Sequence, residues 1–389
     1  MKNRYLIITL LTSFFLVGCH KDDNLNTEPK ITKETVDVLA TQATFKWTVD
    51  WLGKFSSVVE VSENADMSAS RYYGSEAETE NHDFTAMATG LKELTMYYYR
   101  YVVWNPNYVN NKFLTEVNSF KMCGGVIESL FSVSANEQVY FSNGNLQYQA
   151  STGTWRFADN QYDYIGESNS NISSSYSGWI DLFGWGTSGW NSGANCYQPW
   201  SMSTSYSDYY PGGSYTNSLT GSYANADWGV YNAISNGGDQ AGLWRTLTYD
   251  EWAYVRNTRS TSSGIRYAMA CVNSQNGMII LPDDWSVSYY SLNSTNNSSA
   301  SCTSNIITAT QWAALEQHGA VFLPAAGDRK GTSIKCVGSF GCYWLSSNHY
   351  GDAWLADFVY FSYSGSDGVD EALISRDNGR SVRLVRDAR

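Results

Sequence analysis

The chain contains 389 residues, with a net charge of −12 and a pI near 4.8. This length exceeds the size that a single hydrophobic core usually supports, so we expect two domains. The acidic balance argues against a nucleic-acid partner, which requires a basic surface. Aromatic residues make up 15% of the chain. Together with abundant Ser, Asn and Gly, they favour carbohydrate or protein ligands.

A secretory signal opens the chain. Lys2 and Arg4 begin a segment whose apolar run, residues 5–17, suits a signal-peptide core and is too short to span a bilayer. The run ends in a motif that resembles the lipobox of bacterial lipoproteins, Leu16-Val17-Gly18-Cys19. The resemblance implies a signal peptide of residues 1–18 and a diacylglycerol anchor on Cys19.

The residues after the anchor are polar. Lys21, Asp22 and Asp23 resemble the export signal of some Gram-negative surface lipoproteins, which implies an outer-membrane location facing the cell exterior. A plain solvated linker is the alternative, since short charged runs are common. We interpret residues 19–27 as a flexible, lipidated tether.

Residues 28–122 show the pattern of an all-β sandwich. Side chains alternate in character over residues 44–49 and 57–62, and residues 96–104 form a long segment dense in Tyr and Val. Turn residues separate these segments at the spacing of short strands. No catalytic cluster is visible, so we interpret this domain as a spacer.

Part of this first domain resembles a fibronectin type III domain. Leu91, Thr95 and Tyr97 fall where that family has its Leu, Thr and corner Tyr before the penultimate strand. In related sandwiches, the hydroxyl of this Tyr bonds back to the backbone upstream. Trp47 takes the place of the core Trp of an early strand.

The second domain spans residues 131–389. Short predicted strands over residues 131–157 precede a stretch rich in Gly, Ser, Asn, Tyr and Trp that runs through residue 241. This stretch is too long to be a structureless loop in a compact domain without function or local packing. It contains an aromatic run that we interpret as core-lining turns: Trp179, Phe183, Trp185 and Trp190.

Two helices are predicted farther along. Thr248 and Glu251 fit a capping box, in which each side chain bonds a backbone amide of the other residue. Thr308 and Gln311 have the same spacing at a second helix, which Gly319 is expected to end.

Several segments of this domain resemble the formylglycine-generating-enzyme (sulfatase-modifying factor) superfamily. Residues 247–256, LTYDEWAYVR, are similar to a characteristic segment of that family. Residues 323–327, 341–347 and 379–383 resemble its bacterial non-enzymatic relatives. The resemblance implies a C-type-lectin-like α+β fold, with two helices on a small twisted sheet and long loops.

Residues 345–378 resemble the hypervariable segment of diversity-generating-retroelement proteins within that superfamily. Reverse transcription that errs at adenines cannot produce Lys, Gln, Glu, Met or Trp from AAY codons. Between residues 345 and 375 there is no Lys, Gln or Met, and the exceptions are Glu371 and Trp354. An ordinary Ser/Gly/Tyr-rich loop is the alternative.

The predicted ligand-binding surface lies in this segment, because Tyr gives large contact area and small polar residues give adaptable hydrogen bonds. Strand alternation would turn about half of its side chains inward, with Trp354, Phe358 and Phe361 as leading candidates. The candidate binding residues are Asn348, His349, Tyr350, Asp352, Trp354, Asp357, Tyr360, Tyr363, Ser364 and Asp367.

We expect a binder of a glycan or protein ligand on another cell, host or phage, and no enzyme. An oxidase of the formylglycine-generating type is the first alternative, but Cys336 and Cys342 do not match the spacing or setting of that family's copper-binding pair. We expect them to form a structural disulfide or two buried thiols. A structural subunit of a surface appendage is another alternative. No Cys/His cluster has zinc spacing, so we predict no metal and no cofactor.

Overall fold

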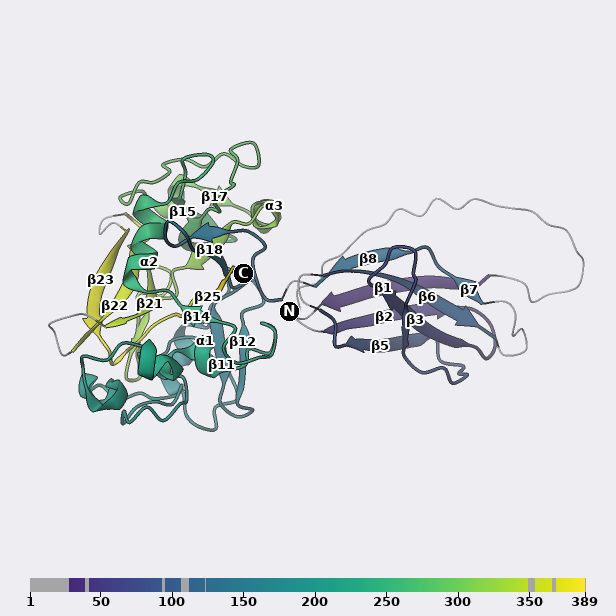
Figure 1. The fold of residues 1–389 in the computed structure, drawn as a ribbon, viewed down its shortest axis with the longest axis horizontal. Helices are drawn as coiled ribbons and strands as arrows, with labels where there is room; N and C mark the ends of the chain where they lie inside the picture. The colour runs from purple at the N-terminus through teal and green to yellow at the C-terminus, as the bar shows by residue number, and fades with distance from the viewer. Residues whose placement is uncertain are drawn as a thin grey trace, which may run out of the picture. The chain divides into compact units, whose positions relative to one another are not determined.

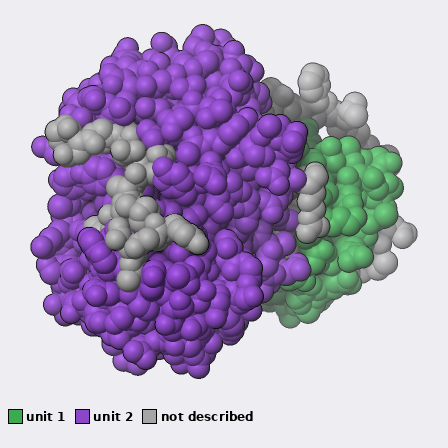
Figure 2. Space-filling view, turned by 60° about the vertical axis from the view of Figure 1, so that its left-hand side comes forward, with its two compact units in different colours: residues 1–124 green, residues 125–389 purple. Residues whose placement is uncertain are grey.

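The computed structural model describes residues 28–38, 42–92, 95–105, 112–122, 124–348, 354–365 and 369–388. The chain divides into two compact units, residues 1–124 and 125–389 (Figure 2). Several small sheets and few helices make up these units (Figure 1). This architecture confirms the prediction of a mainly β, multidomain chain.

Where unit 1 is described, its strands form two antiparallel sheets. The first has the order β1-β2-β5, and in the second β4, β3, β6 and β7 are neighbours and β8 also pairs with β6. The strands are β1 (Lys30–Val38), β2 (Gln42–Asp50), β3 (Ser56–Ser62), β4 (Arg71–Tyr73), β5 (Asp83–Thr89), β6 (Met96–Trp104), β7 (Phe113–Leu114) and β8 (Asn118–Lys121).

Alternation along β2 builds the core of unit 1. Phe45, Trp47 and Val49 are buried, and the residues between them are more exposed. The Trp47 ring lies 4.8 Å from the ring of Tyr101 on β6, so side chains of the two sheets meet in one core. Burying side chains of this size stabilises the fold by about 2–3 kcal/mol each.

The corner tyrosine lies where the sequence predicts it. The hydroxyl of Tyr97 accepts a hydrogen bond from the backbone amide of Lys92 at 2.9 Å. Burial raises the pKa of Tyr97, although the Lys92 amide opposes this shift. The bond ties the start of β6 to the preceding loop.

The strands in the described residues of unit 2 form five small sheets. Their strand orders are β14-β25-β10-β9, β12-β11-β13, β17-β15-β16-β18, β20-β19-β24 and β21-β22-β23. The strands are β9 (Phe131–Ser132), β10 (Gln138–Phe141), β11 (Leu146–Gln149), β12 (Thr154–Phe157), β13 (Trp179–Ile180), β14 (Arg245–Thr246), β15 (Tyr267–Val272), β16 (Gln275–Ile280), β17 (Ile306–Ile307), β18 (Val321–Pro324), β19 (Asp328–Lys330), β20 (Ser333–Lys335), β21 (Phe340–Asn348), β22 (Leu355–Ser362), β23 (Val369–Ser375), β24 (Asn378–Gly379) and β25 (Leu384–Asp387).

The two predicted capping boxes are confirmed at two of the α-helices. Thr248 and Glu251 cap α2, and Thr308 and Gln311 cap α3, with both reciprocal bonds formed in each case. Gly319 follows α3 with a φ of 85°. The helices are α1 (Trp228–Tyr231), α2 (Tyr249–Ala253), α3 (Ala309–Gln317), the π-helix η6 (Tyr254–Thr258), and the 3-10 helices η2 (Gly166–Asn171), η3 (Tyr206–Tyr209), η4 (Pro211–Gly213), η5 (Gly221–Ala226) and η7 (Cys302–Ser304).

The β21-β22-β23 sheet lies between two hydrophobic clusters. On β22, Val359 and Phe361 belong to one cluster, whereas Ala356 and Phe358 belong to the other. Both faces of the central strand, β22, are therefore packed against a hydrophobic cluster. In Figure 1 these strands form the yellow region of unit 2.

In the described parts of the chain, no helix has both the length and the apolar character needed to cross a bilayer. The expected lipidation site, Cys19, and the tether lie outside the described residues.

Candidate ligand-binding surface

The predicted binding residues are only partly described. Asn348, Trp354, Asp357, Tyr360, Tyr363 and Ser364 have defined places in the fold. Four others lie outside the described residues: His349, Tyr350, Asp352 and Asp367.

Two of the predicted binding residues are buried or half-buried. Asp357 is only 5% exposed, because both faces of β22 are covered. Tyr360 is half-buried, and its ring stacks on Phe340 at 5.3 Å. The burial of Asp357 corrects the prediction that it faces a ligand. Tyr360 packs on Phe340 and is half-buried, and its binding role stays a prediction.

The exposed candidates fall at opposite ends of β22. Trp354 is 47% exposed and Tyr363 is 46% exposed, whereas Phe358 and Phe361 are buried as expected. Strand alternation favours an inward orientation for Trp354, but its side chain is exposed to water. Tyr363 lies nine positions after Trp354, which corresponds to about 30 Å along an extended strand. A single predicted surface is therefore divided into two patches.

The Tyr363 patch is tied to a neighbouring loop. The backbone carbonyl of Tyr363 accepts bonds from the Cys302 amide at 2.8 Å and from the Ser301 hydroxyl at 3.2 Å. The side chains of Tyr363 and Ser364 remain exposed. This end of the sheet offers one aromatic anchor.

At the other end of the sheet, Asn348 joins β21 to a distant loop. Its Nδ2 donates to the carbonyls of Tyr215 at 3.3 Å and Thr216 at 3.0 Å. Its backbone amide donates to the Ser218 hydroxyl at 3.1 Å, and its side-chain oxygen accepts from the same hydroxyl. Asn348 therefore fixes the position of the loop at residues 215–218 against the end of β21.

Arg376 makes the second connection between these segments. Its guanidinium donates from Nε to the Leu355 carbonyl at 2.9 Å and from Nη2 to the Tyr215 carbonyl at 2.7 Å. The same group lies over the rings of Trp185 at 4.4 Å and Tyr210 at 5.3 Å. Cation–π contact of this kind is stronger when the cation is removed from water.

Burial dominates the electrostatics of Arg376. It lowers the pKa of this guanidinium to about 10, although Tyr210 and Asp357 act in the opposite direction. Arg376 therefore remains protonated at neutral pH. Burial also raises the pKa of Tyr210, an effect that the Arg376 charge reduces.

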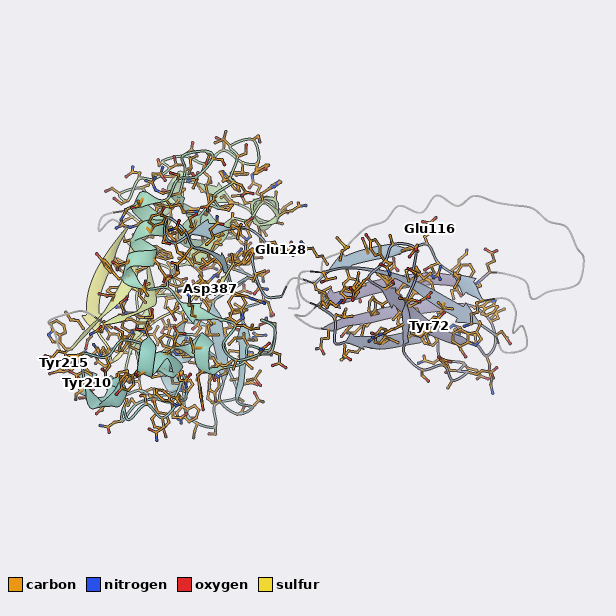
Figure 3. The ribbon with its side chains drawn as sticks, in the orientation of Figure 1. Tyr72, Glu116, Glu128, Tyr210, Tyr215 and Asp387 are labelled. Atoms are coloured by element: carbon orange, nitrogen blue, oxygen red, sulfur yellow. The ribbon has the colours of Figure 1, made fainter. Side chains whose placement is uncertain are left out.

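Arg376 and Asn348 support what we call the tyrosine surface: Tyr206, Tyr210 and Tyr215. The Tyr210 ring centroid lies 6.3 Å from that of Tyr206 and 6.3 Å from that of Tyr215. Tyr206 is 44% exposed and Tyr215 is 39% exposed. Figure 3 labels Tyr210 and Tyr215 where they lie together at the end of the β21-β22-β23 sheet.

The base of this surface is held by further bonds across the chain. The Leu219 amide donates to the Ser346 carbonyl at 2.8 Å, and the Trp185 indole donates to the Leu345 carbonyl at 2.9 Å. Phe183 and Trp185 are fully buried, whereas Trp179 and Trp190 are partly buried. Phe183 and Trp185 therefore line the core, and Trp185 contacts the Arg376 guanidinium that also lies over the Tyr210 ring.

The tyrosine surface was not among the sites predicted from the sequence. A usable signal was present, because residues 209–226 contain several tyrosines and no charged side chain. A long, neutral, Tyr-rich stretch has the composition of a binding loop. What the pattern does not indicate is that this loop lies against residues 348 and 376.

The five cysteines in the described residues are free thiols. Cys336 is exposed and Cys342 is buried, so the expectation of a disulfide or two buried thiols is not met. Burial raises the pKa of both thiols, more than the nearby Arg380 lowers it. Among the described residues, no three His, Cys, Asp or Glu side chains form a group that could hold a metal ion.

No protein-family model and no curated protein matches this chain. Two solved structures with similarity both show the sensor domain of the anti-sigma factor RsgI4 from Pseudobacteroides cellulosolvens, and the second of them is a solution structure. They show 21% and 19% identity over 25% of this chain, and cover 88% and 74% of their own chains. Both have a TM-score of 0.20, so they support no conclusion about the fold or function of this chain.

Proposed function

We propose that this chain is a cell-surface lipoprotein that binds a glycan or protein ligand, and that it performs no chemistry. The lipobox-like motif ending at Cys19 and the charged residues after it support the location. Unit 1 acts as a fibronectin type III-like spacer, which the Tyr97 corner bond supports. Unit 2 is a C-type-lectin-like domain, which the capped helix in residues 247–256 supports.

One observation carries the binding proposal. Three neighbouring tyrosines lie on a base fixed by a buried arginine and by Asn348. Rigid, exposed tyrosines give large contact area at low entropic cost, which is how binding loops achieve affinity. Trp354 adds an exposed aromatic side chain at the same end of the sheet. Its position there follows from the hydrogen bond of 3.1 Å that its carbonyl accepts from the Arg376 amide.

Chemistry at the cysteines is disfavoured on electrostatic grounds. A thiolate is the reactive form of cysteine, and burial raises the pKa of both Cys336 and Cys342. No observation in the described residues of unit 2 favours the oxidase alternative over binding.

The experiment is a glycan and protein array probed with the purified full-length chain. We compare the wild type with a Tyr206→Ser/Tyr215→Ser double variant and a matched control, Tyr231→Ser, whose exposure of 43% is similar. The proposal predicts a signal that the double variant loses and the control keeps. Equal signals for all three proteins would reject the tyrosine surface as the binding site.

A further inference from the structure

Apart from the buried Arg376, the described part of the tyrosine surface carries a single charged side chain near its rings, the carboxylate of Asp208. Residues 209–226 contain no charged side chain. The carboxylate of Asp208, which flanks this loop, accepts bonds from Asn195 at 2.9 Å and from the Ser203 hydroxyl at 2.5 Å. Arg376, the cation beneath the loop, is fully buried. The loop therefore offers a ligand neutral hydroxyl groups and aromatic rings, and the carboxylate of Asp208 at its edge disfavours an anionic ligand.

We propose that the ligand is a single, soluble chain of a neutral polysaccharide, bound along Tyr206, Tyr210 and Tyr215. This inference rests on the proposed function and specifies its ligand. The non-polar C–H faces of sugar rings pack on aromatic rings, and the tyrosine hydroxyls both donate and accept hydrogen bonds to sugar hydroxyls.

The relative orientation of the rings favours a twisted chain over a flat surface. The planes of Tyr206 and Tyr210 meet at 45°, and those of Tyr210 and Tyr215 at 55°. A crystalline polysaccharide presents coplanar sugar faces, which need coplanar aromatic rings. Rings that rotate from one to the next suit a chain whose successive sugar units also rotate.

The remaining side chains of the loop favour a glycan over a protein partner. Its apolar residues Pro211 and Leu219 are buried. Ser207, Thr216 and the backbone at Gly212 and Gly213 are exposed. Protein interfaces usually add apolar and Arg contacts at their centres, whereas small hydroxyl groups and tyrosine rings match the hydroxyl-rich surface of a sugar chain.

Affinity electrophoresis of the full-length chain tests this inference. Native gels contain soluble amylose, α-mannan, galactomannan or the anionic polygalacturonate, and crystalline cellulose is tested by pull-down. We expect at least one neutral chain to retard the protein, with little change between low and high salt because no exposed ion pair is involved. Tyr206→Ala and Tyr215→Ala should each weaken binding about tenfold, and Tyr231→Ala should leave it unchanged.

The inference would be overturned if none of the neutral chains retarded the protein, or if the protein bound only crystalline cellulose. It would also be overturned if polygalacturonate retarded the protein and salt abolished the effect, or if Tyr231→Ala weakened binding as much as the two other variants. A protein ligand on the array that requires Tyr206 and Tyr215 would reject the polysaccharide and keep the proposed function. Ligand binding that neither tyrosine variant affects would reject both.

Discussion

Arg376 donates a 2.7 Å hydrogen bond to the backbone carbonyl of Tyr215, 161 residues earlier in the chain. The contact joins the end of β23 to the neutral tyrosine loop. Because the acceptor is a carbonyl, any residue could stand at position 215 without breaking the bond. The geometry of the surface therefore depends on Arg376, while its chemistry depends on the loop.

Replacement of Arg376 tests this dependence. Arg376→Lys keeps the charge but cannot reach the Leu355 and Tyr215 carbonyls with a planar fork. We expect the free energy of unfolding of unit 2 to fall by about 2 kcal/mol, since bonds to charged groups contribute roughly 1.5–3 kcal/mol. Urea denaturation followed by tryptophan fluorescence measures this, with the exposed Arg71→Lys as control. A stability equal to the wild type would show that Arg376 is dispensable.

The buried carboxyl of Asp181 should make the stability of unit 2 depend on pH. This buried carboxylate has a pKa raised to about 6 by burial, although bonds from Ile165 and Asn169 oppose the shift. The pKa of Asp181 is higher in the folded state than in the unfolded state, so the folded state favours the protonated carboxyl. The contribution of this protonated form to the free energy of unfolding is complete below about pH 4 and is lost as pH rises through about 6. Relative to Asp181→Asn, the wild type should lose about 3 kcal/mol between pH 4 and 7.

The Asp181 prediction is tested by the change of the free energy of unfolding with pH, and not by the free energy at one pH. Asn at this position places an N–H donor opposite another donor, which costs roughly 1–3 kcal/mol at every pH. The stability of the wild type minus that of the variant should therefore fall by about 3 kcal/mol from pH 4 to pH 7, which brings it to zero or reverses its sign. A constant difference across this range would show that Asp181 does not titrate as described.

The corner bond of unit 1 gives a prediction that is independent of unit 2. Tyr97→Phe removes the hydroxyl that accepts the Lys92 amide, and we expect a loss of about 1 kcal/mol in the stability of unit 1. Tyr98→Phe, at the neighbouring half-buried residue, should have a smaller effect. Differential scanning calorimetry, which reports each unit's transition, can compare them. The reverse order would show that the Tyr97 bond does not stabilise unit 1.

Glu251 takes part in two interactions, so its replacement should lower the stability of unit 2 more than replacement of its capping partner Thr248. Its carboxylate accepts the Thr248 amide at 2.8 Å and also pairs with Arg245 at 2.6 Å. We expect Thr248→Ala to cost about 1 kcal/mol, as is typical of a lost cap, and Glu251→Ala to cost about 2 kcal/mol. Thermal unfolding of the two variants provides the comparison. A smaller loss for Glu251→Ala would mean that the Arg245 pair contributes nothing.

Local patterns predicted local structure well. The segment 96–104 coincides with β6, and both capping boxes appear where Thr248 and Thr308 predict them. These features depend on residues a few positions apart, whose side chains bond to nearby backbone groups. The coarse fold class follows from the same short-range signals.

The composition of the binding surface was not predictable for physical reasons. The segment 355–362 reads as a nearly continuous apolar run, which does not reveal which residues face a core when both faces are covered. For this reason the sequence did not reveal that Asp357 is buried. The links from Asn348 and Arg376 to Tyr215 are made to carbonyls, and a carbonyl carries no side-chain signature in the sequence.

Tyrosine nitration would show whether a ligand covers the tyrosine surface. The full-length chain is treated with tetranitromethane, alone and bound to a ligand found on the array, and nitration of each tyrosine is quantified by mass spectrometry. We predict that ligand protects Tyr206 and Tyr215 and leaves the similarly exposed Tyr231 and Tyr289 unchanged. Unchanged nitration of Tyr206 and Tyr215, with protection confined to other residues such as Tyr72 of unit 1, would contradict binding at this surface.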